Sequence, residues 1–368
     1  MSGIRILHAA DLHLDSPFEG LPEKTAAQRR GEQRVLLQRL AELCWKERAQ
    51  LVLLPGDLLD TGSAYMETAE ELLRTLGAMG VPVFIAPGNH DFYSPRSPYA
   101  RLTWPENVRI FKSAQMDCVA LPALSARVWG AAFTDSHCGG LLDGFEVEKE
   151  IGTIDIMCVH GEVGARESVY DPITEDGIAR SGMDYIALGH IHKESGLRRA
   201  GDTYYAWPGC PEGRGFDEMG DRFVYLVTVG EGTCTLQKEK IFLRRYVVLK
   251  TDKTTPEEVL AELPAGTEKD ICRIILMGEA DEAPDMEGFR RALEDRFFAL
   301  QLRDETRIRR DVWEKAGDDT LRGIFLRMLR ERLDGAKTGE ERELCEQAAR
   351  WGLAALDNRE EVRRHENP

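Results

Sequence analysis

The stretch Leu51-Val52-Leu53-Leu54-Pro55-Gly56-Asp57 decides how this chain is organised. Four consecutive large aliphatic residues, closed by Pro-Gly-Asp, predict a strand that is buried on both faces and presents a carboxylate where it ends. In open α/β sheets, ligands bind beyond the carboxyl ends of the strands. We therefore expect Asp57 to lie at a functional site.

Four other apolar runs end in polar residues in the same way. The residues that follow them are Asp11-Leu12-His13, Gly88-Asn89-His90-Asp91, His160-Gly161 and Gly189-His190-Ile191-His192. Side chains two positions apart on an extended strand lie on the same face, so His13 and His192 each share a side with a polar partner. We expect the five strand ends to meet at one point.

These residue types favour a metal site. A lone histidine is more often a core or surface residue, but five of the eight histidines stand at these strand ends, beside aspartate, asparagine or glycine. Imidazole and carboxylate together suit divalent transition metals such as manganese, iron or zinc. The eight candidate ligands exceed the coordination of one ion and suit two ions that share a bridging carboxylate. They are Asp11, His13, Asp57, Asn89, His90, His160, His190 and His192.

Length and composition are those of an ordinary globular protein, with 42% hydrophobic and 30% charged residues. Its 368 residues exceed the ~250–300 residues at which single cores stop growing, so we expect one large domain with smaller appendages. No apolar run approaches the ~20 residues of a membrane span. The N-terminus leads straight into a strand and the eight cysteines form no CxxC pair, which predicts a cytoplasmic protein with reduced thiols and no signal peptide.

The net charge of −16 argues against simple nucleic-acid binding, because nucleic-acid binders usually carry a basic surface. An acidic chain must bind phosphates through local features, such as bound cations, or through a partner. Part of the acidity can belong to the metal site, whose carboxylates each count as −1 until cations occupy them.

Strands and helices alternate in the first hundred residues, with helices at 24–49 and 66–79 between the strands. This alternation predicts a parallel sheet covered by helices. The loop at 14–21 is either a strand–helix connection or a wall of the substrate cleft. Short strands at 107–112, 116–121 and 126–133 are expected to be antiparallel.

The pattern changes near Thr251. Residues 249–310 predict a small α/β module, and residues 319–358 predict two helices, of which the second opens with the capping box Thr338-x-x-Glu341. A helix pair cannot bury both of its faces alone. Its apolar stripe therefore docks either on the protein's own domain or on a partner helix.

Taken together, the five motifs resemble those of the calcineurin-like metallophosphoesterases, in order and in spacing. They read Asp11-x-His13, Gly56-Asp57-x-x-Asp60, Gly88-Asn89-His90-Asp91, His160-Gly161 and Gly189-His190-x-His192. The resemblance covers about residues 1–245. It implies an α/β fold in which a β-sandwich core is flanked by helices (αββα), here expected as a domain of residues 1–248.

Two further segments, Asp11-Leu-His-Leu-Asp-Ser-Pro-Phe18 and Pro208 to Glu218, look like those of bacterial SbcD-type DNA-repair nucleases, especially the YhaO-like branch. In that comparison, residues 249–310 resemble the capping domain. Residues 319–358 resemble the helices that dock on the coiled-coil base of the ATPase partner. One departure is that Gly215 follows Arg214, where many relatives have histidine, which leaves the role of this loop open.

The resemblance also implies a role for each motif residue. One metal would be held by Asp11, His13, Asp57 and His192, and Asp57 would bridge to a second metal that Asn89, His160 and His190 complete. The expected ions are two manganese ions, with magnesium, iron or zinc as alternatives, which activate a bridging hydroxide.

Other residues would act beside the metals. His90 is expected to protonate or stabilise the leaving oxygen without binding metal. Asp60 and Asp91 either orient a ligand or His90, or cap helices. Ser16 and Arg214 are candidates for substrate contact.

Three functions are compatible with these residues. The first is a DNA exo- or endonuclease that works in repair with an SbcC-like coiled-coil ATPase and forms a homodimer, as is usual in the family. The second is a phosphodiesterase or phosphatase for a small molecule, which the acidic charge favours. The third, a scaffold with a vestigial metal site, is weakest because every ligand type is intact. The extra α/β module and the helix pair favour the first.

Overall fold

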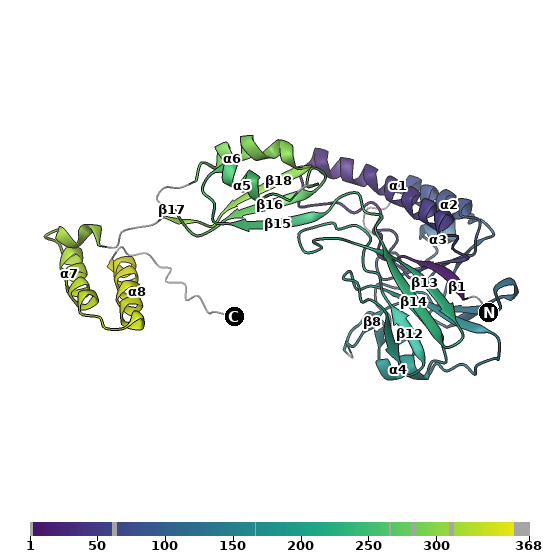
Figure 1. Cartoon of the computed structure of the whole chain (residues 1–368). Helices are drawn as coiled ribbons and strands as arrows, with labels where there is room; N and C mark the ends of the chain where they lie inside the picture. Colours follow the sequence, from purple (N-terminus) through teal and green to yellow (C-terminus); the bar gives the residue numbers. More distant parts are fainter. Residues whose placement is uncertain are drawn as a thin grey trace. The chain divides into compact units, whose positions relative to one another are not determined.

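The computed structural model describes residues 3–60, 65–165, 167–264, 266–280, 284–308 and 313–356 (Figure 1). The chain forms two compact units. The first comprises Met1–Leu249, Leu263–Ile274 and Leu293–Gln301, and the second comprises Lys250–Glu262, Ile275–Ala292 and Leu302–Pro368. The domain boundaries expected at residues 248 and 310–319 stay predictions. Within the described residues, none of the helices has the length and apolar character that crossing a membrane requires.

The first unit contains two six-stranded sheets. The first sheet has the order β14-β13-β1-β2-β3-β4, in which β1 to β4 are parallel and β13 is antiparallel to both of its neighbours. Its strands are β1 (Ile4–His8), β2 (Leu51–Leu54), β3 (Val83–Ile85), β4 (Val108–Ile110), β13 (Val224–Gly230) and β14 (Thr233–Glu239).

Strand β4 corrects the expectation of an antiparallel strand at 107–112. It pairs in parallel with β3, from Val83 opposite Val108 to Ile85 opposite Ile110. The connection between the two strands, residues 86–107, is long enough for the crossover that parallel neighbours require.

The second sheet has the order β11-β12-β10-β7-β6-β5. Its four inner strands are parallel, and the strands at its two edges are antiparallel to their neighbours, which confirms the antiparallel pair expected at 116–121 and 126–133. Its strands are β5 (Asp117–Leu121), β6 (Ala126–Gly130), β7 (Ile154–His160), β10 (Tyr185–Gly189), β11 (Arg198–Ala200) and β12 (Thr203–Ala206).

The two sheets pack face to face, and helices cover their outer faces. Leu51 and Leu53 of β2 point into a core shared with Ile156 of β7 and other residues of the second sheet. Val52 and Leu54 point the other way, into a core with α1 (Glu23–Lys46) and α2 (Met66–Ala78). The helix α4 (Glu175–Arg180) buries Ile178 against the outer face of the second sheet. The fold is therefore the expected αββα sandwich.

The small α/β module has one three-stranded sheet, in the order β15-β16-β18. Each of its strands begins in the first unit and ends in the second. The elements of this part of the chain are β15 (Tyr246–Thr251), α5 (Pro256–Glu262), β16 (Ile271–Leu276), β17 (Glu279–Ala280), α6 (Met286–Leu293), β18 (Ala299–Asp304) and β19 (Arg307–Ile308). The shorter elements of the first unit are α3 (Pro98–Arg101), β8 (Glu162–Val163) and β9 (Pro172–Ile173).

The C-terminal helices α7 (Leu321–Asp334) and α8 (Gly339–Leu356) pack against each other. Leu326 and Ala349 are buried, and the partly buried Phe325, Leu329 and Leu353 pack against them. Several large apolar residues of the two helices are exposed instead: Leu321, Ile324, Met328, Leu344 and Trp351. Residues 357 and 358 of the predicted helix pair lie outside the described part of the chain.

Candidate metal centre

The loops that follow β1 and β2 run side by side. The backbone N–H of Asp11 donates to the carbonyl of Gly56 (3.1 Å), and that of His13 donates to the carbonyl of Asp57 (2.9 Å). Asp11, His13, Asp57 and His190 have positive φ angles of 54°, 43°, 52° and 91°. Such conformations cost about 1–3 kcal/mol each and persist where the surrounding structure enforces them, which is common at functional sites.

Two glycines allow the loops of the two sheets to touch. Gly56 has a φ of 84°, and a Cβ atom there would lie 2.5 Å from Nδ1 of His160. A Cβ atom at Gly88 would lie 2.8 Å from Cε1 of the same histidine. A larger residue at either position would push apart the side chains of the candidate centre.

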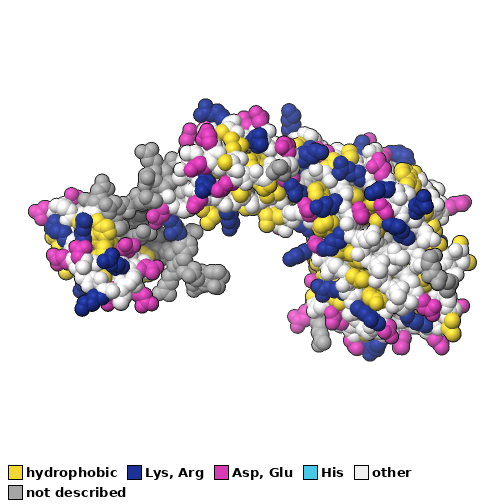
Figure 2. Space-filling view, viewed as in Figure 1, with side chains coloured by type: hydrophobic (Ala, Val, Ile, Leu, Met, Phe, Trp, Pro, Cys, Tyr) yellow, Lys and Arg dark blue, Asp and Glu magenta, His cyan; other side chains and the backbone are white. Residues whose placement is uncertain are grey.

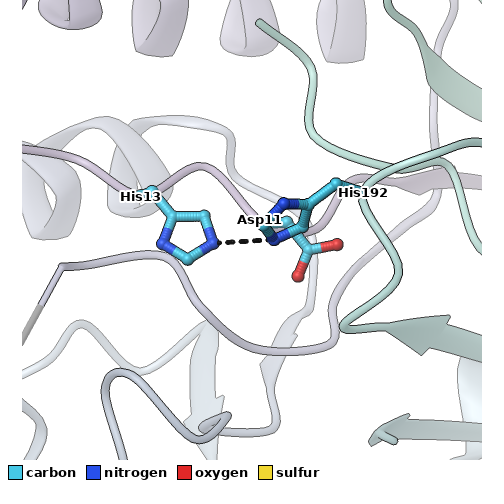
Figure 3. A group of neighbouring side chains, drawn as sticks. All are labelled: Asp11, His13 and His192. Carbon is cyan, nitrogen blue, oxygen red and sulfur yellow. Dashed lines mark hydrogen bonds between the residues drawn. The ribbon is translucent and has the colours of Figure 1, made fainter. Parts of the chain in front are cut away.

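Three overlapping groups of potential ligands meet here, and within each group the ligand atoms lie within 4.8 Å of one another. The groups are Asp11–His13–His192, His13–Asp57–His90 and Asp57–His160–His190. In the first group, drawn in Figure 3, Nε2 of His13 is 3.2 Å from Nε2 of His192. Asp57 belongs to the other two groups, with Oδ2 3.4 Å from Nε2 of His160 and 3.8 Å from Nε2 of His13.

Asn89 is the seventh predicted ligand, and it contacts the two histidines that the second sheet supplies. Its Oδ1 lies 2.9 Å from Nε2 of His160 and 3.1 Å from Nδ1 of His190. The structure thus gathers all seven predicted ligands, with Asp57 in the middle. Their roles as ligands stay predictions.

The electrostatics of these side chains fit divalent cations. Burial, together with the neighbouring Asp57, raises the pKa of Asp11 to about 7. Burial lowers the pKa values of His160 and His190 to about 4, so both imidazoles are neutral at pH 7. Among the described residues, the buried Oδ2 of Asp11 and Nδ1 of His13 have no hydrogen-bond partner. Crowded carboxylates and neutral imidazoles with free lone pairs form a suitable donor set for two divalent ions.

Asp91 holds two of the loops together. Its carboxylate accepts hydrogen bonds from the backbone N–H groups of Asp57 (3.1 Å), Leu58 (2.7 Å) and Gly88 (2.8 Å), and from the hydroxyl of Tyr99 (2.5 Å). It caps no helix, because α2 and α3 begin at other residues. Of the two interpretations of Asp91, the contacts favour the one in which it positions the bridging carboxylate.

His90 contacts Asp60 beside the candidate centre. Its Nδ1 lies 3.2 Å from Oδ1 of Asp60, and this hydrogen bond raises the pKa of His90. Ser16, expected as a substrate contact, is buried, and its hydroxyl is one of the groups that lower the pKa of Asp60. The side chain of Arg214 is 20% exposed and its Nη2 lies 3.1 Å from Nδ1 of His192.

Gln33 and Glu218 are among the residues near the centre that were not predicted. Gln33 of α1 donates to the carbonyl of His13 (3.0 Å) and accepts from the N–H of Asp15 (2.7 Å), which fixes the loop after β1. Glu218 lies 2.7 Å from Nδ1 of His192. The sequence could have pointed to Glu218, because it stands four positions from Arg214 in the same loop and can pair with it. No feature of the sequence distinguishes Gln33 from any other glutamine on a helix.

The similarity of this chain to known proteins shows its family. The model of the calcineurin-like phosphoesterases matches residues 4–194. The chain belongs to this family. Together with the clustered ligands, this makes the protein a metal-dependent phosphoesterase with a centre for two divalent ions.

Individual relatives differ in their extent of similarity. The uncharacterized metallophosphoesterase YhaO of Bacillus subtilis is 28% identical over 340 residues, which is 87% of this chain and 82% of that protein. The DNA double-strand break repair protein Mre11 of Aeropyrum pernix is 27% identical over 231 residues, 56% of this chain and 53% of that protein. A dimetal phosphatase structure from Danio rerio has a TM-score of 0.44 and 11% identity, covering 66% of this chain and 98% of that one.

Asp171 should make the stability of this phosphoesterase depend on pH. Its Oδ1 accepts the N–H of Leu141 (2.6 Å), its Oδ2 is buried without a hydrogen-bond partner among the described residues, and burial raises its pKa to about 7. Because the unfolded chain releases this proton at lower pH than the folded protein, the free energy of unfolding should fall as pH rises from about 4 to 7. The slope is up to about 1.4 kcal/mol per pH unit.

Asp171→Asn should remove this component, since the amide oxygen still accepts the N–H of Leu141 but no longer ionises. Urea unfolding of the metal-free protein at pH 5 and pH 8 measures the effect, with the exposed Asp176→Asn as control. The wild type and the control should lose more stability than Asp171→Asn between the two pH values. Equal losses in all three proteins would contradict the prediction.

Proposed function

We propose that this phosphoesterase hydrolyses the phosphodiester bonds of DNA in repair, with two manganese ions at the centre built around Asp57. The observation that carries this proposal is the similarity to the A. pernix protein, whose name assigns it to DNA double-strand break repair. The α/β module and the helix pair, which follow the catalytic region, add support because a phosphatase for small molecules has no evident use for them.

The chemistry is divided between the cations and the side chains. When bound, the two cations activate water and neutralise charge on the phosphoryl oxygens. Asp11, His13, Asp57 and His192 would hold one ion, and Asp57, Asn89, His160 and His190 the other. His90, with its side chain 40% exposed, stands beside these residues and remains accessible to a substrate.

His90 is the proposed proton donor. With Nδ1–H donating to Asp60, the protonated ring keeps its second proton on Nε2, and Asp60 favours this charged form. A nucleotide alkoxide is a poor leaving group, so a proton delivered from Nε2 lowers the barrier. Arg214 is the proposed contact for a phosphate oxygen, since its guanidinium lies next to His192.

The helix pair is the proposed docking site for a coiled-coil ATPase of the SbcC type. Leu321 and Met328 of α7 are 69% and 61% exposed, and Leu344 and Trp351 of α8 are 66% and 54% exposed. Hydrophobic side chains are visible on the surface of this pair in Figure 2. A row of apolar side chains on paired helices suits a coiled-coil partner. Such a partner would also strengthen the binding of DNA, which we expect a chain of net charge −16 to bind only weakly by itself.

A nuclease assay tests the reaction. Single-stranded and duplex DNA are incubated with the protein and manganese, beside a panel of cyclic nucleotides. We expect cleavage of DNA that EDTA abolishes. Cleavage of cyclic nucleotides alone would instead support the alternative, a small-molecule phosphodiesterase, which the acidic net charge favours.

A pull-down tests the partner. Co-purification with a coiled-coil ATPase should be lost on deletion of residues 320–356, and on charging the exposed face with Leu321→Glu and Met328→Glu. Arg330→Glu, a charge change elsewhere on the same helix, is the control and should bind. If the charged variant still binds the ATPase, the helix pair would instead be expected to dock on the protein's own domain. Light scattering of the purified protein tests the proposed homodimer.

A further inference from the structure

The loop between β12 and β13 encloses the backbone of His192. The N–H of Cys210 (3.2 Å) and Nη1 of Arg222 (2.7 Å) both donate to the carbonyl oxygen of His192. A Cβ atom at Gly209, which has a φ of 76°, would lie 2.3 Å from the same oxygen. The loop therefore closes on this one residue of the candidate metal centre, and only glycine fits at position 209.

The same loop also reaches the imidazole of His192. Oε1 of Glu218 lies 2.7 Å from Nδ1 of His192, and the Glu218 side chain is 5% exposed. The other carboxylate oxygen accepts the backbone N–H of Arg214 (2.7 Å). The Glu218 backbone carbonyl accepts a hydrogen bond from Nε of Arg222 (3.2 Å). Glu218 is thus fixed at both ends within the loop, and its Oε1 is directed at the ring.

Two groups compete for Nδ1 of His192, and they require opposite tautomers of the neutral ring. Glu218 can only accept a proton from Nδ1, whereas Arg214, at 3.1 Å, can only donate to it. The contact with Glu218 is the shorter one. Arg214 has in addition a partner in the same carboxylate, since Nη2 donates to Oε1 of Glu218 (2.9 Å). The contacts therefore favour a proton on Nδ1 of His192.

We propose that Glu218 is a positioning residue that holds His192 in the Nδ1–H tautomer. In this state the lone pair of Nε2 points to the side where Asp11 and His13 lie (Figure 3). A carboxylate behind a metal-binding imidazole fixes the orientation of the ring and raises its basicity, and its loss typically lowers metal affinity 10–100-fold. This assigns a role to the loop at 208–222. It rests on the metal centre and not on the choice of DNA as substrate.

The tautomer can be read without metal and without substrate. Two-bond ¹H–¹⁵N correlation spectra of the metal-free protein, at a pH where the ring is neutral, distinguish Nδ1–H from Nε2–H. The signal missing from His192→Gln identifies the residue. We expect Nδ1–H in the wild type. In Glu218→Ala the proton should move to Nε2, because Arg214 then becomes the remaining partner of Nδ1. The Nδ1–H form in Glu218→Ala, or the Nε2–H form in the wild type, would overturn the proposal.

Titration with manganese supplies the second measurement. Calorimetry of the wild type should report two ions, and Glu218→Ala should weaken one of them about 10–100-fold while the other stays unchanged. Glu218→Gln, whose amide oxygen can still accept from Nδ1–H, should lose less affinity than the alanine variant. Asp217→Asn removes an exposed carboxylate from the same loop and should bind as the wild type does. Unchanged affinity, or equal weakening of both ions, would overturn the assignment. Because no substrate enters either measurement, a failed nuclease assay would leave the result standing.

Discussion

Asp57→Asn should lower phosphodiesterase turnover at least ~10³-fold and weaken the binding of both cations. Asp57 is common to the groups on either side of the centre, and its side chain is 2% exposed. A neutral amide in its place removes the negative charge that both cations share. If this charge supplies about 4 kcal/mol of the stabilisation of the transition state, the loss is about a thousandfold. Manganese calorimetry and turnover of bis-p-nitrophenyl phosphate measure the two effects.

The stability of the same variant should change in the opposite direction in the absence of metal. Burial raises the pKa of Asp57, which shows that its charged form is disfavoured in the metal-free protein. Asp57→Asn should therefore have a higher melting temperature than the wild type in EDTA. Manganese should raise the melting temperature of the wild type more than that of the variant. Two tightly bound ions and near-normal turnover in Asp57→Asn would contradict the bridging role.

His90→Asn should retain both cations but lose about 10²–10⁴-fold of its turnover on DNA. The backbone N–H of residue 90, which donates to Oδ1 of Asp57 (2.9 Å), is kept in this variant. The proton on Nε2 is lost, and with it the assistance to a poor leaving group. Turnover of bis-p-nitrophenyl phosphate should fall much less, because p-nitrophenolate leaves without a proton.

The ratio of turnover on DNA to turnover of bis-p-nitrophenyl phosphate makes this prediction specific. Asp60→Asn, which removes the charge that favours protonated His90, should change the ratio in the same direction and by less. An exposed histidine outside the candidate centre, in His137→Asn, is the control and should leave both activities unchanged. Equal losses on both substrates, or loss of a cation, would show that His90 acts in metal binding instead.

Local sequence patterns were sufficient to predict the strand ends and the polar residues that follow them. An apolar run closed by Gly-Asp or Gly-Asn-His is a short-range signal, and the strands that precede Asp57, Asn89 and His160 lie where the runs predicted them. The direction of β4 was not predicted correctly, because an exposed-and-buried alternation over three residues does not distinguish a parallel neighbour from an antiparallel one.

Local patterns also did not predict which apolar residues of the helix pair are exposed. Its apolar residues were predicted as a stripe that needs a partner, and the structure divides them between two faces. Phe325 and Leu329 pack within the pair, whereas Leu321 and Met328 stay exposed. Neighbouring positions on a helix differ by 100° in direction, so which of them faces the second helix depends on how the two helices cross.

The sequence by itself determined that five strands lead into candidate metal ligands and that the motifs containing them belong to a calcineurin-like phosphoesterase. Only the tertiary structure decided that β1, β2 and β3 lie in one sheet while β7 and β10 lie in the other, so that the centre forms where two sheets meet. That meeting depends on contacts far apart in the chain, such as Nδ1 of His160 against the carbonyl of Pro55 (2.9 Å). The contact of Glu218 with His192 has the same origin. No local pattern encodes such contacts, because they arise when the packing of the two cores brings the loops together.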